Sequence, residues 1–260
     1  MKPTFKLFIL SFLDKELTLF SASLSFYTIF MLVPLLLIVM TFLSTFPFFE
    51  GFYEEVQRFV FSNLLPLNGS VVMKYIDTFL HNSSKIGLWS FTTLILSSFF
   101  FFQSYEYIVN TIFKTKQRNF FHSLKVYFML LIFTPFVLGL AFSVSGYIAL
   151  FMQQHIHSSI NLLPLIPYSM LWLLFFILFK VSINTKVENK VLFWSSFISS
   201  SIFSLAKWGF LYYVILNQVY TTIYGSFSTV LFLFFWIYVS WMIFIYGLKL
   251  CFLLDKGENL

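Results

Sequence analysis

The feature that most constrains this chain is a set of apolar stretches, each long enough to cross a lipid bilayer as a helix. From Val191 to Leu216 the residues are apolar or small, and Lys207 is the only charged one. About 20 helical residues, at about 1.5 Å each, span the hydrocarbon of a bilayer. Only 10% of the chain is charged and 59% is apolar, whereas about 25% of a soluble domain is charged. The sequence therefore predicts an all-α integral membrane protein.

Six such stretches predict six transmembrane helices in a single membrane domain, residues 1–260. The predicted spans cover about residues 22–46, 87–113, 126–151, 164–183, 191–216 and 227–250. Residues 1–21 carry basic residues before a polar group and are expected to form an interfacial helix. Residues 47–86 show apolar side chains at helical spacing on both sides of a Pro–Leu–Asn–Gly turn, which predicts an amphipathic helical pair in the first outer loop.

The basic residues predict the orientation. If the N-terminus is cytoplasmic, the inner segments hold twelve Lys and Arg, and the outer segments hold three, namely Arg58, Lys74 and Lys85. Cytoplasmic loops carry such an excess, so both termini are expected in the cytoplasm. The same distribution argues against nucleic acid as a partner, because the basic residues form no continuous groove with interleaved aromatic side chains.

Lys207 is the first candidate binding residue. Ser196, Ser200 and Ser204 precede it at intervals of four on one helical face. A lysine within a bilayer costs about 2.5–3.5 kcal/mol and usually faces a protein interior or a wet cavity. One interpretation is that Lys207 extends to the outer interface. The other is that it binds an anionic group, with the serines lining the path.

A second polar face lies near the inner end of the second span. Gln103, Glu106 and Asn110 are spaced at i, i+3 and i+7. Counting from the nearest inner lysines, Glu106 is about 12 Å deep and Lys207 about 25 Å deep. A direct ion pair between them needs a broken or tilted helix, so the favoured interpretation places two sites at different depths of one polar interior.

Two positions are candidate hinges. Pro34 lies inside the first span, where a proline removes one backbone hydrogen bond and either kinks the helix or provides a hinge. Gly225 lies in the uncharged segment 217–226 between the last two spans.

Catalytic chemistry finds little support in the sequence. The single Cys251 excludes an internal disulfide, and the four histidines show no metal-ligand spacing. No nucleophile elbow, zinc-protease motif or phosphate-binding loop is present. We therefore expect no metal, no cofactor and no enzymatic activity.

An ordered set of short motifs resembles the YihY/BrkB family of bacterial inner-membrane proteins. The motifs are Ala22-Ser-Leu-Ser-Phe-Tyr, Leu32-Val-Pro-Leu, Asn63-Leu-Leu-Pro, Glu106, Asn110-Thr-Ile-Phe, Ala206-Lys-Trp-Gly-Phe, Tyr220, Ile223-Tyr-Gly, Trp236-Ile-Tyr and Ser240-Trp. The resemblance implies six transmembrane helices in the bacterial inner membrane. Members generally end the last span with a Gly-Ala-Glu-like sequence, whereas this chain has Gly247-Leu-Lys249.

The resemblance also brings the label ribonuclease BN, which the residues do not support. Phosphodiester hydrolysis normally needs metal-holding clusters or an acid–base pair in water. Two hypotheses remain ahead of it. One is a transporter or flippase-like protein for an anionic lipid or small solute, with membrane lipids as partners. The alternative is a non-catalytic envelope scaffold that contacts a partner through the outer helical pair.

Overall fold

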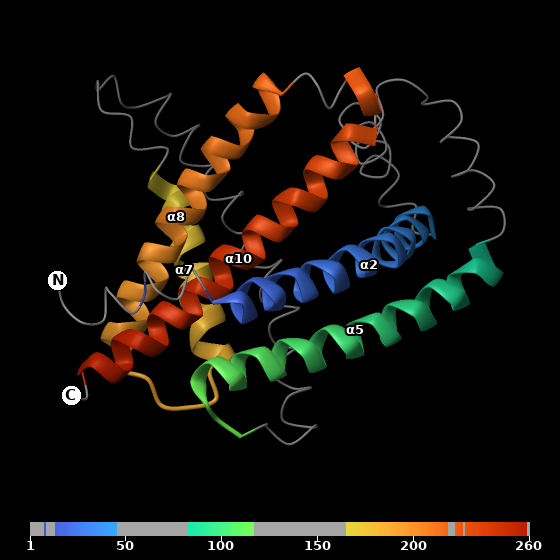
Figure 1. Ribbon diagram of the computed structural model, residues 1–260. Coiled ribbons are helices and arrows are strands. Elements are labelled where there is room, and N and C mark those ends of the chain that lie inside the picture. The colour runs from blue at the N-terminus through green and yellow to red at the C-terminus, as the bar shows by residue number, and fades with distance from the viewer. Residues whose placement is uncertain are drawn as a thin grey trace, which may run out of the picture. The chain divides into compact units, whose positions relative to one another are not determined.

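The structure, a computed structural model, describes residue 8 and residues 14–45, 83–116, 165–217, 222–225 and 227–258. Its long helices are α2 (Lys15–Thr45), α5 (Ser83–Phe113), α7 (Leu165–Ser182), α8 (Asn189–Leu216) and α10 (Phe227–Glu258), shown in Figure 1. The described residues contain no strand, so the all-α prediction is confirmed for them. The predicted span 126–151 and nearly all of the predicted outer pair lie outside the described residues.

Several helices extend beyond the predicted spans. Residues 15–21, which the sequence placed in a separate interfacial helix, belong to α2, and α10 continues past residue 250 to Glu258. The reason is that hydropathy marks the thickness of the lipid, whereas helical hydrogen bonding continues into water. The start of α2 is capped, since the backbone N–H of Glu16 donates to Asp14 Oδ1 at 3.0 Å.

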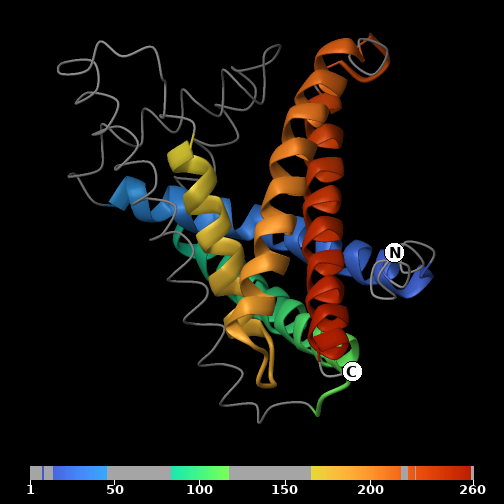
Figure 2. The ribbon, with the colours of Figure 1, turned by 90° about the vertical axis from the view of Figure 1, so that its left-hand side faces the viewer.

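The chain divides into two compact units. Unit 1 comprises Met1–Phe20, Tyr105–Gly209 and Met242–Leu260, and unit 2 comprises Ser21–Ser104 and Phe210–Trp241. Unit 1 therefore holds the start of α2, the end of α5, all of α7, the first part of α8 and the last part of α10. In unit 1 the view of Figure 2 shows the beginning of α8 between α7 and the end of α10.

The core of unit 1 is aromatic. Phe179 of α7 is fully buried, and its ring lies 5.3 Å from that of Phe244 on α10 and 6.0 Å from that of Phe175. Ile245 and Leu248 of α10 are also fully buried. These side chains hold the end of α10 against α7.

Unit 2 has its own contacts. The indole Nε1 of Trp241 on α10 donates to Thr28 Oγ1 on α2 at 2.9 Å. The ring of Phe101 on α5 lies 5.7 Å from that of Trp241. On the other side of α10, Phe210 of α8 stacks on Trp236 with the ring centroids 5.0 Å apart. Trp241 thus links α2, α5 and α10.

Hydroxyl groups along the helices bond to their own backbone. Ser25 donates to the carbonyl of Ser21 at 2.6 Å, and Ser97 donates to that of Thr93 at 2.6 Å. Ser240 does the same with Trp236 at 2.8 Å. An unpaired hydroxyl is costly in an apolar environment, and this local bond removes the cost. Serine can therefore occur in apolar helices, where it serves as a small residue.

Two of the helices are long and apolar enough to cross a membrane when only the described residues are searched. They cover Asn189–Leu216, with mean hydropathy 1.2, and Val230–Gly257, with mean hydropathy 2.1. A shorter apolar helix covers Tyr168–Ser182.

Candidate functional site

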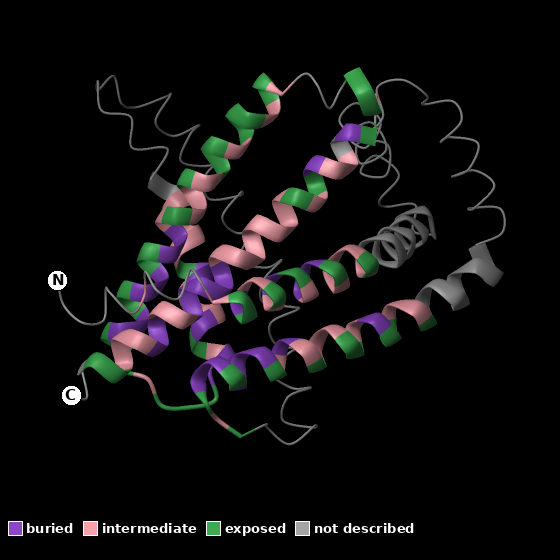
Figure 3. Cartoon of the chain, viewed as in Figure 1, coloured by how far each residue is buried: buried purple, intermediate pink, exposed green. Residues whose placement is uncertain are grey.

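The first half of α8 presents a doubled row of serines. Ser195, Ser196, Ser199 and Ser200 have at most 1% of their surface exposed. Large side chains occupy the opposite face, where Trp194 is 51% exposed. Figure 3 shows this alternation of buried and exposed strips along the helix. Small residues let neighbouring helices approach closely, and we call these four serines the serine seam.

Helix α7 covers one side of the serine seam. Trp172 Nε1 donates to Ser196 Oγ at 3.1 Å, and the Ser196 hydroxyl donates to the Phe193 carbonyl at 3.0 Å. The Trp172 ring meets the Phe193 ring edge-on at 4.8 Å. One turn away, the hydroxyls of Tyr168 and Ser201 are 2.6 Å apart. Ser196 therefore joins two helices.

Helix α10 covers the other side at Gly247. A Cβ on Gly247 would meet the Oγ of Ser199, and it would lie 2.8 Å from Phe179 Cζ and 3.0 Å from Ser199 Cβ. Real Cβ atoms essentially never come closer than 3.0 Å to such neighbours. Only glycine therefore fits between α7 and α8 at this position. One turn further on, the buried Cys251 lies beside Ser195.

The predicted face of serines and Lys207 has two different environments in the structure. Ser196 and Ser200 are fully buried in the helix contact, and Ser204 is half-buried. Lys207 is exposed, as are its neighbours Leu205 and Trp208, which are 71% and 75% exposed. The buried serines lie in the helix contact, whereas Lys207 lies among exposed apolar side chains. Its binding role stays a prediction.

The second predicted face becomes more buried along α5. Gln103 is exposed, Glu106 is half-buried and Asn110 is 6% exposed. Asn110 Oδ1 accepts a hydrogen bond from Thr115 Oγ1 at 2.8 Å. The buried Nδ2 of Asn110 has no hydrogen-bond partner. Asn110 thus ties the end of α5 to the chain that follows, while a role for the three residues in ligand binding stays a prediction.

The end of α5 is closed by a left-handed residue. The backbone N–H of Thr115 donates to the Asn110 carbonyl at 2.9 Å, and that of Lys114 donates to the Thr111 carbonyl at 3.3 Å. These are the two bonds of a Schellman motif, in which the left-handed residue is usually glycine. Here it is Lys114, with φ 54°, at a cost of about 1–2 kcal/mol.

The loop after α7 meets this end of α5. Asn184 Nδ2 donates to the carbonyl of Lys116 at 3.0 Å. Tyr105 on α5 and Ser182 at the end of α7 are joined through their hydroxyl groups. The residues that follow α5 and the loop that follows α7 are thus in contact.

The two candidate hinges have different environments. Pro34 lies within α2, which is continuous from Lys15 to Thr45. Gly225 adopts φ 54° before α10, and its carbonyl accepts from the N–H and hydroxyl of Ser228 at 3.2 and 2.7 Å. Neither arrangement tests a hinge motion.

Substituting Gly225 by alanine should destabilise the protein by about 1 kcal/mol, because a Cβ disfavours positive φ. No atom lies within 4 Å of that Cβ, so backbone strain alone is expected. Thermal unfolding in detergent measures the effect. Gly225→Asn serves as the matched variant, with a smaller loss, since asparagine tolerates this conformation better. Equal loss in both variants would contradict the assignment to φ.

Sequence reasoning missed half of the serine seam and its covering residues. Ser195, Ser199, Trp172 and Gly247 were not singled out as site residues. The available signal was the pairing of small residues at 195–196 and again at 199–200, a repeat of four. Nothing in the sequence indicated which helices would cover them. No group of three or more metal-ligating side chains occurs among the described residues.

Apolar helices joined through small residues and internally bonded hydroxyls define a helical membrane protein. The family described as Virulence factor BrkB matches residues 8–259. This chain belongs to that family, which confirms the resemblance seen in the sequence.

The relatives are membrane proteins. A UPF0761 membrane protein of Haemophilus influenzae (strain 86-028NP) is 29% identical over 253 residues, covering 96% of this chain and 94% of the relative. A UPF0761 membrane protein of Mannheimia succiniciproducens is 28% identical, covering 96% of this chain and 88% of the relative. One of Alteromonas mediterranea is 29% identical and covers all of this chain and 90% of the relative. No solved structure matches.

Proposed function

We propose that this protein crosses the bacterial inner membrane six times with both termini in the cytoplasm, and that it binds and moves an anionic lipid or small solute at Lys207. It performs no hydrolysis of nucleic acid. The observation that carries the proposal is the exposed Lys207 on a helix that is long and apolar enough to cross a membrane.

The described helices support the topology, because helices are found over five of the six predicted spans. The apolar run of residues 126–151 lies between α5 and α7 in the sequence, and the proposal assigns the remaining crossing to it. The excess of basic residues, twelve in the predicted inner segments and three in the outer ones, supports cytoplasmic termini.

The chemistry of Lys207 supports an anionic ligand. Lys207 is 17 residues beyond Lys190, or about 25 Å along the helix, which places it in the outer half of the bilayer. An unpaired charge there costs about 2.5–3.5 kcal/mol. A phosphate or carboxylate removes part of that cost by forming a charge-assisted hydrogen bond. The exposed Leu205 and Trp208 on each side offer apolar contact to an acyl chain or similar group.

Native mass spectrometry of the protein released from mild detergent tests the binding site. We expect wild type to retain an anionic lipid or metabolite, and Lys207→Met to retain about tenfold less, or ~1.4 kcal/mol of binding energy. Lys207→Arg is the matched variant, because it keeps the charge, and should retain the ligand. Identical spectra for all three proteins would favour the scaffold hypothesis.

Transport needs a second assay. In vesicles that contain the purified protein, a fluorescent phosphatidylglycerol analogue should cross between leaflets faster than in protein-free vesicles. Lys207→Met should lower that rate to the protein-free value, and Lys207→Arg should preserve most of it. Binding without movement in wild type would refute the transport part of the proposal and leave the binding part standing.

A further inference from the structure

The end of α10 holds two ammonium groups around one aromatic ring. Lys249 Nζ lies 5.8 Å from the centroid of the Phe252 ring, and Lys256 Nζ lies 4.9 Å from it. The two lysines are seven residues apart, so they share one stripe of the helix at a spacing of two turns. Both contacts are within the range of cation–π attraction. Two like charges held beside one apolar ring favour an anion that bridges them.

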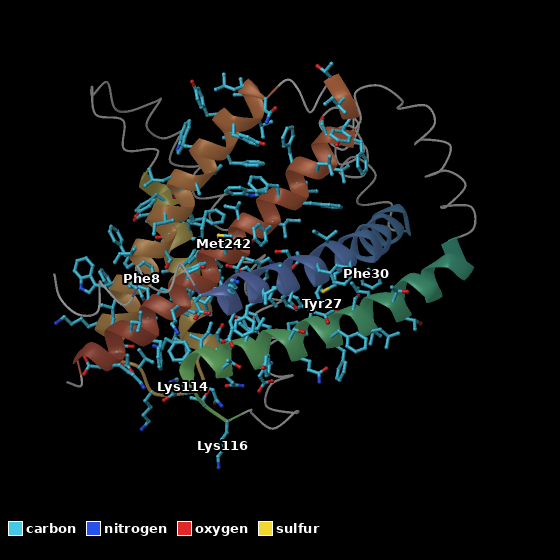
Figure 4. The ribbon with its side chains drawn as sticks, in the orientation of Figure 1. Phe8, Tyr27, Phe30, Lys114, Lys116 and Met242 are labelled. Atoms are coloured by element: carbon cyan, nitrogen blue, oxygen red, sulfur yellow. The ribbon has the colours of Figure 1, made fainter. Side chains whose placement is uncertain are left out.

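A third lysine stands at the neighbouring helix end. The Phe113 ring of α5 meets the Phe252 ring edge-on at 5.7 Å, and the next residue is the left-handed, exposed Lys114. Lys114 occupies a position that favours glycine and so carries backbone strain, which points to a role for its side chain. Figure 4 labels Lys114 at this end of α5 and shows Lys116 directed away from the helices.

The depth of this cluster fits a lipid headgroup. Lys249 is 22 residues from Phe227, where α10 begins, or about 33 Å along the helix, close to the ~30 Å thickness of the hydrocarbon. Lys256 is about 10 Å further. Phe252 lies between them along α10. The segment also carries two acids, Asp255 and Glu258, and Asp255 lies close enough to act on the buried Cys251.

We propose that Lys114, Lys249 and Lys256 bind the phosphate of an anionic phospholipid, with the buried Phe252 ring holding the two lysines of α10 beside it. Anionic lipids of the cytoplasmic leaflet are recognised by basic residues at such helix ends. This site is separate from Lys207 and does not depend on the activity proposed for it.

The test is the rise in thermal unfolding midpoint when lipid is added to the full-length protein in neutral detergent. Phosphatidylglycerol should raise the midpoint more than phosphatidylcholine does. The Lys249→Gln/Lys256→Gln variant should lose more than half of this difference. Lys180→Gln/Lys186→Gln is the matched control, because it removes two lysines of the same unit, one of them 5.9 Å from the Phe176 ring. The control should keep the difference.

The Lys114→Gly variant tests whether Lys114 belongs to the lipid site. Glycine relieves the left-handed strain, so the midpoint without lipid should rise while the effect of phosphatidylglycerol falls. A capping lysine with no part in the site would raise the midpoint and leave the lipid effect unchanged, which would overturn the three-lysine site.

Four outcomes decide the proposal. When Lys207→Met is already present, phosphatidylglycerol must still raise the midpoint more than phosphatidylcholine, and Lys249→Gln/Lys256→Gln must still remove more than half of this difference. This result would separate the site from the one at Lys207. The Lys249→Arg/Lys256→Arg variant must keep the effect, because it preserves the charges. The proposal is overturned if inorganic phosphate or glycerol phosphate raises the midpoint as much as the lipid does, or if the control double variant loses as much as Lys249→Gln/Lys256→Gln.

Discussion

Gly247→Ala is expected to destabilise the protein by about 1–3 kcal/mol, the usual cost of adding a methyl group to a closely packed site. The new Cβ would overlap Ser199 Oγ and lie 2.8 Å from Phe179 Cζ. Ser199 is 1% exposed and Phe179 is fully buried, so neither has room to move aside. The helices would have to separate, and α10 would lose its close contact with α7 and α8.

Thermal unfolding in detergent measures this effect, and Gly209→Ala is the matched control. Gly209 is also helical, but a Cβ there has no atom within 4 Å. Alanine is the better helix former by about 1 kcal/mol, so Gly209→Ala should be neutral or stabilising. Ser199→Ala removes the overlapping Oγ and should recover part of the loss in the double variant. Additive losses would show that Ser199 is not the obstacle.

Phe179→Ala is expected to cost more, about 3–5 kcal/mol, which is typical for emptying an aromatic site in a core. Phe179 is fully buried, and its ring lies 5.3 Å from Phe244 and 6.0 Å from Phe175. In a membrane protein the helices are held by packing rather than by exclusion of water, so the lost contacts are not replaced. Phe175 also contacts Phe244, but Phe179 is the fully buried ring in the contact of α7 with α10.

Phe227→Ala provides the control for Phe179→Ala, because Phe227 is 55% exposed at the start of α10. Denaturation of both variants in a graded mixture of mild and denaturing detergent compares their stabilities. We expect a large shift of the midpoint for Phe179→Ala and a small one for Phe227→Ala. Equal shifts would mean that the loss reflects apolar surface in general and not the core of unit 1.

Much of the fold could be predicted from the sequence, because the lipid environment restricts the backbone to few structures. A chain in hydrocarbon must satisfy its own backbone hydrogen bonds, so long apolar runs become helices. Helices are found over five of the predicted ranges, although α2 and α10 extend further at their polar ends. The order of short motifs likewise predicted the family, which the match over residues 8–259 confirms.

The site was less predictable. Ser196 and Ser200 were expected beside Lys207 on one face, but the structure buries the two serines and exposes the lysine. Spacing along a helix predicts which residues share a face, but it carries no information about where a neighbouring helix ends. The change from buried to exposed occurs between Ser200 and Lys207, along a single face.

By itself, the sequence of this protein determined that it is helical, that it is a membrane protein and which family it belongs to, because these properties depend on local composition and on motif order. Only the tertiary structure decided that Gly247 lies against Ser199 and that Phe113 of α5 meets Phe252 of α10. In each of these contacts, the two residues belong to different helices that are far apart in the chain. Such contacts are selected by the fit of side-chain shapes, which no pattern along one helix contains.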